Sequence, residues 1–217
     1  SSDLTWVAEL QALRTYLDLP EIHLLGQSWG GMLAIIYGCD YRPQGIKSLI
    51  LASTLSSARL WAQEQHRMIR LMSPADQSAI ATAERLQDFT GAAYLTANQH
   101  FMTQHASGPI TADDPEFLRR SKRVGTTAYN VAWGPNEYNP TGTLADYEYT
   151  DRLQYLQMPT LVTSGTDDLC TPLVAKTMVD QLPHATWTLF PRSRHMAFID
   201  ETTAYMTRLR HWLAAHD

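Results

Sequence analysis

The stretch "GQSWGG", residues 26–31, separates two segments of different character. The run before it, "EIHLL", is typical of a short buried strand, and the run after it, "MLAIIYGCDY", is typical of a helix. A Gly-x-Ser-x-Gly pattern at such a junction indicates a nucleophile elbow, a turn so tight that the serine takes a strained backbone conformation. We therefore predict that Ser28 is a nucleophile and that Gly26 and Gly30 avoid collisions within the turn. The N–H of Trp29 is expected to face a developing oxyanion. The alternative is a chance match in a loop.

Composition and charge narrow the class of protein. Of 217 residues, 44% are hydrophobic and 18% are charged, which is an ordinary globular balance. The net charge of −5 comes without a basic run, so we expect no nucleic-acid partner. No apolar run approaches the ~20 residues that span a bilayer, and the opening "SSDLTWVAEL" does not resemble a signal peptide. Two cysteines, Cys39 and Cys170, are too few for a disulfide scaffold, and we expect free thiols in the cytoplasm.

The order of the remaining segments predicts an α/β fold with a mostly parallel sheet and flanking helices. Residues 4–17 carry apolar side chains at helical spacing, and a strand, the elbow helix and a second strand follow. Strand–helix–strand order favours parallel pairing. A helix over residues 171–182 separates two later strands, and residues 201–216 form a closing helix. The expected strands are residues 22–25, 45–54, 160–165 and 186–190.

The middle of the chain has a different pattern, without strand-like runs. It predicts an all-helical insertion at residues 56–150, between core segments at residues 1–55 and 151–217. Two of its helices begin with a capping residue followed by proline, at Ser73 and at Asp114. The expected helices are residues 56–72, 73–89, 91–105 and 114–133.

A serine nucleophile needs a base and an orienting acid, which follow it in the chain order Ser, Asp or Glu, His. Two adjacent acids, Asp167 and Asp168, come directly after one late strand, and His195 comes after the next. Both places are carboxyl ends of expected strands, where open α/β sheets keep their sites. We assign Asp167 as the acid and His195 as the base. No His or Cys pair has convincing zinc-ligand spacing, so no metal is expected.

Several segments together resemble the proline iminopeptidases (prolyl aminopeptidases) of the α/β-hydrolase superfamily. They are "HLLGQSWGGMLA", "GPNEY", "DRLQYLQMPTLVTSGTDDLCTP" and "RHMAFID". The resemblance implies an α/β-hydrolase fold, a triad of Ser28, Asp167 and His195, and a helical cap over the active site. It also implies short-peptide substrates and no cofactor.

The resemblance further implies how a substrate amine is held. Glu137 and Asp168 match positions where the family carries carboxylates for the free α-amine, although the family has glutamate at the second position. An ammonium in a partly dry pocket needs anionic partners, but both acids could also be solvated surface groups. Trp133 and Tyr138, together with Trp29, could form an apolar wall for a proline ring. Core packing is an equally good interpretation of Trp133.

One departure from the family concerns the front of the chain. The N-terminal third that members carry, with the first strands and a glycine-rich loop resembling HGGPG, is missing here. The sheet would then be incomplete, and the strand leading to Ser28 would expose a long apolar edge. We therefore expect the chain to be a fragment that requires the missing N-terminal segment of the same protein.

Two other functions remain open. One is an esterase, amidase or lactonase on the same scaffold, because a fold does not determine a substrate. The other is a non-catalytic binding module, against which the intact set of serine, acid and histidine argues.

Overall fold

The computed structural model describes residues 2–121 and 125–217, and the chain forms two compact units. The first unit comprises Ser1–Trp61 and Asp146–Asp217, and the second comprises Ala62–Ala145. Residues 56–61 and 146–150, which we expected in the helical insertion, therefore belong to the unit that contains the sheet.

The first unit is built on a four-stranded sheet in the order β1-β2-β3-β4, with parallel pairing throughout. This confirms the α/β class and the parallel pairing predicted from the segment order. All four expected strands are present, with ends that shift by a few residues. The strands are β1 (Ile22–Gln27), β2 (Ile46–Ala52), β3 (Thr160–Gly165) and β4 (Ala185–Phe190).

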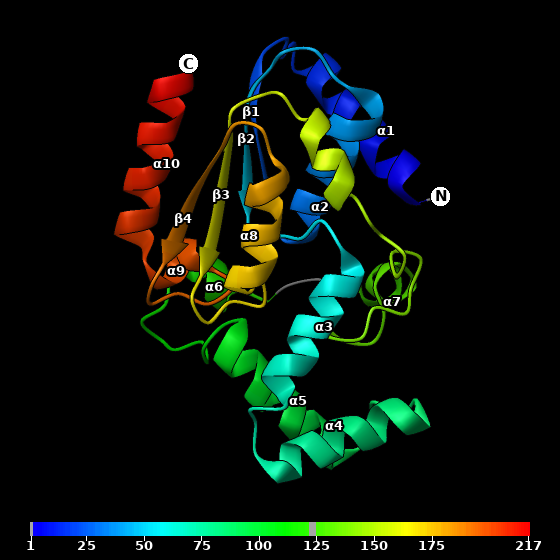
Figure 1. Cartoon of the computed structure of the whole chain (residues 1–217). Helices are drawn as coiled ribbons and strands as arrows, with labels where there is room; N and C mark the ends of the chain where they lie inside the picture. The colour runs from blue at the N-terminus through cyan, green and yellow to red at the C-terminus, as the bar shows by residue number, and fades with distance from the viewer. Residues whose placement is uncertain (1, 122–124) are drawn as a thin grey trace. The chain divides into compact units, whose positions relative to one another are not determined.

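Helices cover both faces of this sheet, which explains why its central strands read as nearly continuous apolar runs. Trp212 of the closing helix packs against Ile50 and Leu161 on one face, and the next residues along β2 and β3 point to the other face. Figure 1 shows α10 on one side of the sheet, with α2 and α8 on the other. The helical segments of this unit are α1 (Ser2–Tyr16), α2 (Trp29–Ile36), η1 (Tyr37–Tyr41), the start of α3 (Ala58–Ile69), η2 (Thr150–Tyr155), α8 (Pro172–Gln181), α9 (Ala197–Asp200) and α10 (Thr202–His216).

In the described residues of the second unit, helices joined by loops are the regular secondary structure and no strand forms, as the absence of strand-like runs predicted. Ser73 caps α4 by accepting a hydrogen bond from the N–H of Asp76, and Pro74 takes the first helical position. The unit contains the rest of α3, followed by α4 (Pro74–Leu86), α5 (Ala92–His105), α6 (Glu116–Arg119) and α7 (Thr126–Ala132).

The expected single helix over residues 114–133 is wrong. The chain forms α6 and α7 there, and residues 122–124 of the expected helix lie outside the described residues. Arg120 ends α6 with an extended backbone, and Gly125 precedes α7 with a non-helical conformation. Helical spacing of apolar residues therefore continued through a stretch whose backbone leaves the helix at Arg120.

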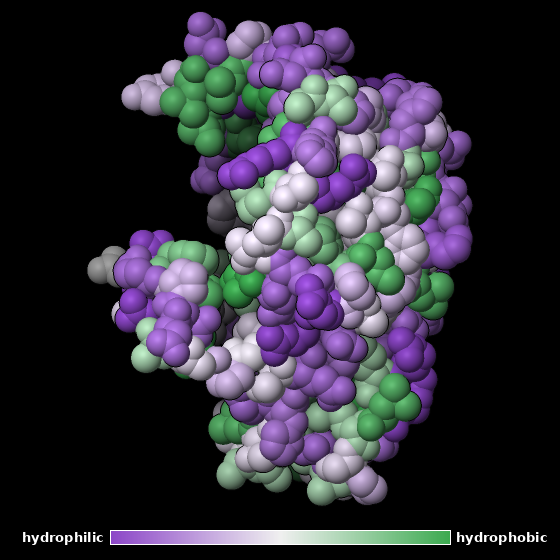
Figure 2. All heavy atoms as spheres, turned by 90° about the vertical axis from the view of Figure 1, so that its left-hand side faces the viewer, coloured by the Kyte–Doolittle hydropathy of each residue, from purple (hydrophilic) through white to green (hydrophobic). Residues whose placement is uncertain are grey.

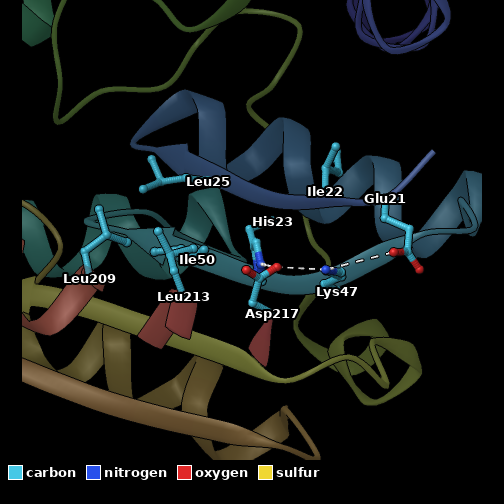
Figure 3. Close-up of a pocket in the computed structure, with 9 residues that line it drawn as sticks. All are labelled: Glu21, Ile22, His23, Leu25, Lys47, Ile50, Leu209, Leu213 and Asp217. Carbon is cyan, nitrogen blue, oxygen red and sulfur yellow. Dashed lines mark hydrogen bonds and ion pairs between the residues drawn. The ribbon is translucent and has the colours of Figure 1, made fainter. Parts of the chain in front are cut away.

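Strand β1 forms one edge of the sheet, and Leu25 on it is 44% exposed. Beside it lies a pocket of about 400 Å³, lined mainly by residues of β1, β2 and α10 (Figure 3). His23, one of the residues that line this pocket, bonds through Nδ1 to the hydroxyl of Ser48, which also accepts a hydrogen bond from the indole of Trp212. The face seen in Figure 2 is mostly hydrophilic or intermediate, with apolar residues in separate patches. In the described part of the chain, we find no helix with the length and apolar character that crossing a bilayer requires.

Candidate active site

The elbow forms where β1 ends and α2 begins. Ser28 has φ 53° and ψ −123°, a conformation that side-chain-bearing residues rarely adopt. Its N–H still donates to the carbonyl of Ala52 at 2.9 Å, so the strand ladder extends to the serine itself. Trp29 is the first residue of α2, and its N–H therefore belongs to the donors that a helix cannot satisfy internally. The predicted strain at Ser28 is thus present, at a helix N-terminus that favours negative charge.

The glycines of the elbow differ in what they permit. A Cβ at Gly26 would lie 2.3 Å from the carbonyl oxygen of Gly30, so this position requires glycine as predicted. A Cβ at Gly30 would meet nothing within 4 Å, and the expectation of a collision there is wrong. The tight contact belongs to Gly31 instead, where a Cβ would lie 2.4 Å from the Cβ of Thr54.

His195 lies beside the elbow and is bonded to an acid. Its backbone carbonyl accepts a hydrogen bond at 3.3 Å from the side chain of Gln27, the residue before Ser28. Its Nδ1 lies 2.7 Å from Oδ1 of Asp168. With Nδ1–H donating to the carboxylate, Nε2 is the ring nitrogen left to accept a proton. The T-shaped contact with the buried ring of Trp61, 6.2 Å between centroids, further restricts the imidazole.

The partner of His195 is therefore Asp168, and the assignment of Asp167 is wrong. Asp168 is 0% exposed, and besides His195 its two oxygens accept from the N–H groups of Gly165 and Cys170 and from the hydroxyl of Ser53. Asp167 is exposed, and its N–H donates to the carbonyl of Ser193. The turn after β3 directs the second acid inward and the first outward.

This geometry also removes Asp168 from the predicted amine site. A carboxylate with four donors and no exposed surface has no oxygen facing a ligand. Burial, followed by the charge of Asp168, holds the pKa of the Cys170 thiol well above its usual range. Cys170 is thus a neutral neighbour of the acid, and its Sγ donates to the carbonyl of Thr54.

The loop that carries His195 is held by two acids that sequence reasoning missed. Glu201 accepts from the N–H of Arg192 and the hydroxyl of Ser193, both to Oε2. Burial acts to raise the pKa of Glu201, but these hydrogen bonds outweigh it and lower the pKa. Asp200 accepts from the backbone and the guanidinium of Arg194, the residue before the histidine. The only signal in the sequence was that these two acids follow closely after the segment "RSRH", residues 192–195, whose backbone N–H groups they accept from.

The remaining predicted residues lie in the helical unit. Oε1 of Glu137 accepts from the hydroxyl of Tyr129 at 2.9 Å, and burial followed by the Glu137 charge raises the pKa of that phenol. Trp133 is buried, and its indole N–H donates to the carbonyl of Glu137. Tyr138 is 0% exposed and packs edge-on against Phe101. Both rings are buried, so neither presents an open wall, and Tyr138 packs within this unit.

The exposed ring near the elbow is that of Trp29. It is 37% exposed and makes a T-shaped contact with Trp6 of α1 at 5.3 Å between centroids. Among residues 2–121 and 125–217, no three His, Cys, Asp or Glu side chains lie close enough together to hold a metal ion.

The comparisons with known proteins agree with the geometry. The family model described as the alpha/beta hydrolase fold matches residues 2–202. A proline iminopeptidase from Lactiplantibacillus plantarum is 99% identical over 98% of this chain and 74% of its own length. The chain belongs to the proline iminopeptidase family of α/β hydrolases.

Solved structures support this family membership. The crystal structure of a proline iminopeptidase from Mycobacterium smegmatis superimposes with a TM-score of 0.85 at 27% identity, covering 99% of this chain and 72% of that one. The crystal structure of VinJ gives a TM-score of 0.87 at 27% identity, covering 97% and 72%.

Proposed function

We propose that this chain is the catalytic part of a serine aminopeptidase that releases N-terminal proline, or another small residue, from short peptides. The observation that carries the proposal is the buried Asp168–His195 hydrogen bond beside the strained Ser28 elbow. Near-identity to a curated proline iminopeptidase supports the substrate class.

In the proposed mechanism, Nε2 of His195 takes the proton of the Ser28 hydroxyl while Oγ attacks the substrate carbonyl. The carbonyl oxygen gains the negative charge, and the N–H of Trp29 stabilises it at the N-terminus of α2. The imidazolium then gives its proton to the leaving amine, and an acyl-enzyme on Ser28 remains. Water, deprotonated by His195, hydrolyses this ester and returns the serine hydroxyl. Asp168 keeps the imidazole in the correct tautomer and stabilises its charged form.

We propose that Glu137 pairs with the free α-ammonium of the substrate, and that the helical unit is the cap that brings it to the active site. Support comes from the partly buried carboxylate of Glu137, which a tyrosine hydroxyl already orients. Both oxygens of Asp168 already accept hydrogen bonds, so Glu137 is the one carboxylate that we propose for the amine.

The test compares proline 4-nitroanilide with its N-acetylated form at neutral pH. Removing one partner of a desolvated charged pair costs roughly 2–5 kcal/mol, so we expect the acetylated substrate to react about 30-fold to several thousand-fold more slowly. Glu137→Gln should narrow that gap by slowing the free-amine substrate. Equal rates on both substrates, within a factor of about three, would favour the esterase or amidase alternative.

The non-catalytic alternative is tested separately with a serine-directed fluorophosphonate probe. Labelling of the protein, lost in Ser28→Ala, supports an activated nucleophile. A folded protein that does not react with the probe would be a binding module.

We also propose that a further strand-forming segment of the same protein pairs with β1. The exposed edge with Leu25 and the apolar side of the adjacent pocket support this (Figure 3). An unpaired apolar edge favours association, so the 217 residues alone are expected to aggregate or lack activity. A monomeric and fully active product would contradict the proposal.

For location we propose the cytoplasm, supported by two buried free thiols.

A further inference from the structure

Ser53 combines a strained backbone with a buried hydroxyl. It follows the last residue of β2, has φ 47°, and is 3% exposed. The left-handed region is unfavourable for a residue with a Cβ, and glycine would adopt it without strain. A serine in this conformation points to a role for its hydroxyl, because strain persists where the surroundings require it.

That hydroxyl contacts the acid partner of His195. Oγ of Ser53 donates to Oδ2 of Asp168 at 2.6 Å, a short charge-assisted bond. Gly165 N–H donates to the same oxygen at 3.0 Å, and the other oxygen accepts from Cys170 N–H and faces His195. The carboxylate is thus held at Oδ2 by groups from the ends of two neighbouring strands, with Oδ1 directed to the imidazole.

The same segment also braces the elbow. The N–H of Ser28 donates to the carbonyl of Ala52, the last residue of β2. Ser28 and Ser53 therefore lie at the adjacent ends of β1 and β2. The next residue, Thr54, donates its hydroxyl to the backbone carbonyl of Ser28 at 2.6 Å. The N–H of Ser53 donates to Thr163 of β3 at 2.8 Å, which anchors the segment.

We propose that Ser53 is a positioning residue that aligns the carboxylate of Asp168 for the base. The left-handed backbone aims the hydroxyl at Oδ2, and the bond directs Oδ1 to Nδ1 of His195. This deepens the proposed function and rests on it. The competing interpretation is that the hydroxyl only satisfies a buried carboxylate and has no effect on turnover.

Two substitutions in the intact protein separate backbone strain from the hydrogen bond. Ser53→Ala removes the hydroxyl and leaves a Cβ in the strained conformation. Ser53→Gly removes the hydroxyl and relieves the strain. If the hydroxyl positions the base, kcat falls by about 10- to 100-fold in both variants, as expected for loss of a hydrogen bond to a charged group, and KM changes little. The melting temperature follows the backbone instead, and Ser53→Gly is more stable than Ser53→Ala.

A matched control is Ser48→Ala. Ser48 is also fully buried at a strand of the same sheet and bonds to two side chains, His23 and Trp212, away from the elbow. This variant should lose stability while kcat of the folded protein is unchanged. The low-field proton NMR signal of the His195–Asp168 hydrogen bond should shift or broaden in both Ser53 variants and remain in Ser48→Ala.

The possible results distinguish the positioning role of Ser53 from the proposed function as a whole. Wild-type kcat in Ser53→Gly, with the low-field signal unchanged, would overturn the positioning role even if Ser53→Ala failed to fold. Failure of the wild-type protein to react with the fluorophosphonate probe would instead refute the proposed function itself. Labelling of wild type with a reduced kcat in both Ser53 variants supports the inference.

Discussion

The choice between two adjacent acids gives the sharpest test of the active site. We compare Asp168→Asn with Asp167→Asn, which make the same chemical change one residue apart. Asp168 is fully buried and accepts from Ser53, Gly165, Cys170 and His195, whereas the side chain of Asp167 is exposed.

The structure sets the size of the expected effects. Asparagine at residue 168 keeps one accepting oxygen and turns an NH₂ group toward donors, so about two of four bonds are lost. At about 1–3 kcal/mol for each buried group left unsatisfied, the free energy of unfolding falls by about 2–6 kcal/mol. The imidazole also loses the partner that selects its tautomer, and kcat should fall by on the order of 10⁴.

Asp167→Asn should behave as a surface substitution. Its backbone N–H keeps the hydrogen bond to Ser193, because the substitution changes only the side chain. We expect kcat on proline 4-nitroanilide within about threefold of wild type, and stability within about 0.5 kcal/mol.

The assay measures kcat on the folded fraction, which circular dichroism and urea unfolding define for each variant. This matters because a loss of several kcal/mol approaches the whole stability of a typical domain. If folded Asp168→Asn kept a tenth of wild-type kcat, or if Asp167→Asn were the slower variant, the assignment of the acid from the structure would be refuted.

Three further perturbations test other parts of the molecule. Ser28→Ala should lower kcat by on the order of 10⁴ or more, since the reacting residues act as a unit, and a variant with a tenth of the activity would exclude a serine nucleophile. Glu201→Gln should weaken the loop of His195 and lower the melting temperature. The pKa of Glu201 is lowered in the folded protein, so its stabilisation of the fold is present above the usual glutamate pKa and is lost as pH falls through the folded value. The free energies of unfolding of variant and wild type should therefore converge in acid. The hydrogen bond to Glu84 raises the pKa of His66. The stabilisation from this pair is therefore fully present below the usual histidine pKa and is lost as pH rises through the raised value. In urea unfolding, the free energy of unfolding of His66→Gln should not show that decline.

The elbow could be predicted because its requirements are local. A strand, a tight turn and a helix follow one another within a few residues, and the collision at Gly26 involves the carbonyl of Gly30, four positions away. Gly31 could not be interpreted in this way. Its neighbour is Thr54, which approaches only when β1 and β2 pair.

The acid shows the limit of sequence reasoning most clearly. Both Asp167 and Asp168 follow β3, and strand order indicates only that one of them meets His195. The turn after β3 and the donors from Ser53, Gly165 and Cys170 decide which carboxylate is buried. Helical spacing likewise failed at Arg120 and at Gly125, where the backbone is not helical.

By itself, the sequence determined the α/β class, the parallel strand order, the helical insertion, and the serine and histidine at strand ends. These follow from periodicity, turn chemistry and the direction of parallel strands, which act over short stretches of chain. Only the tertiary structure decided which acid pairs with His195, that Tyr138 is core, and that Ser53 contacts the acid. Those outcomes depend on groups that lie apart in sequence and meet only in the folded chain. Asp168 and His195 are separated by 27 residues, and Ser53 and Asp168 by 115 residues, the latter meeting because neighbouring strands place their ends together.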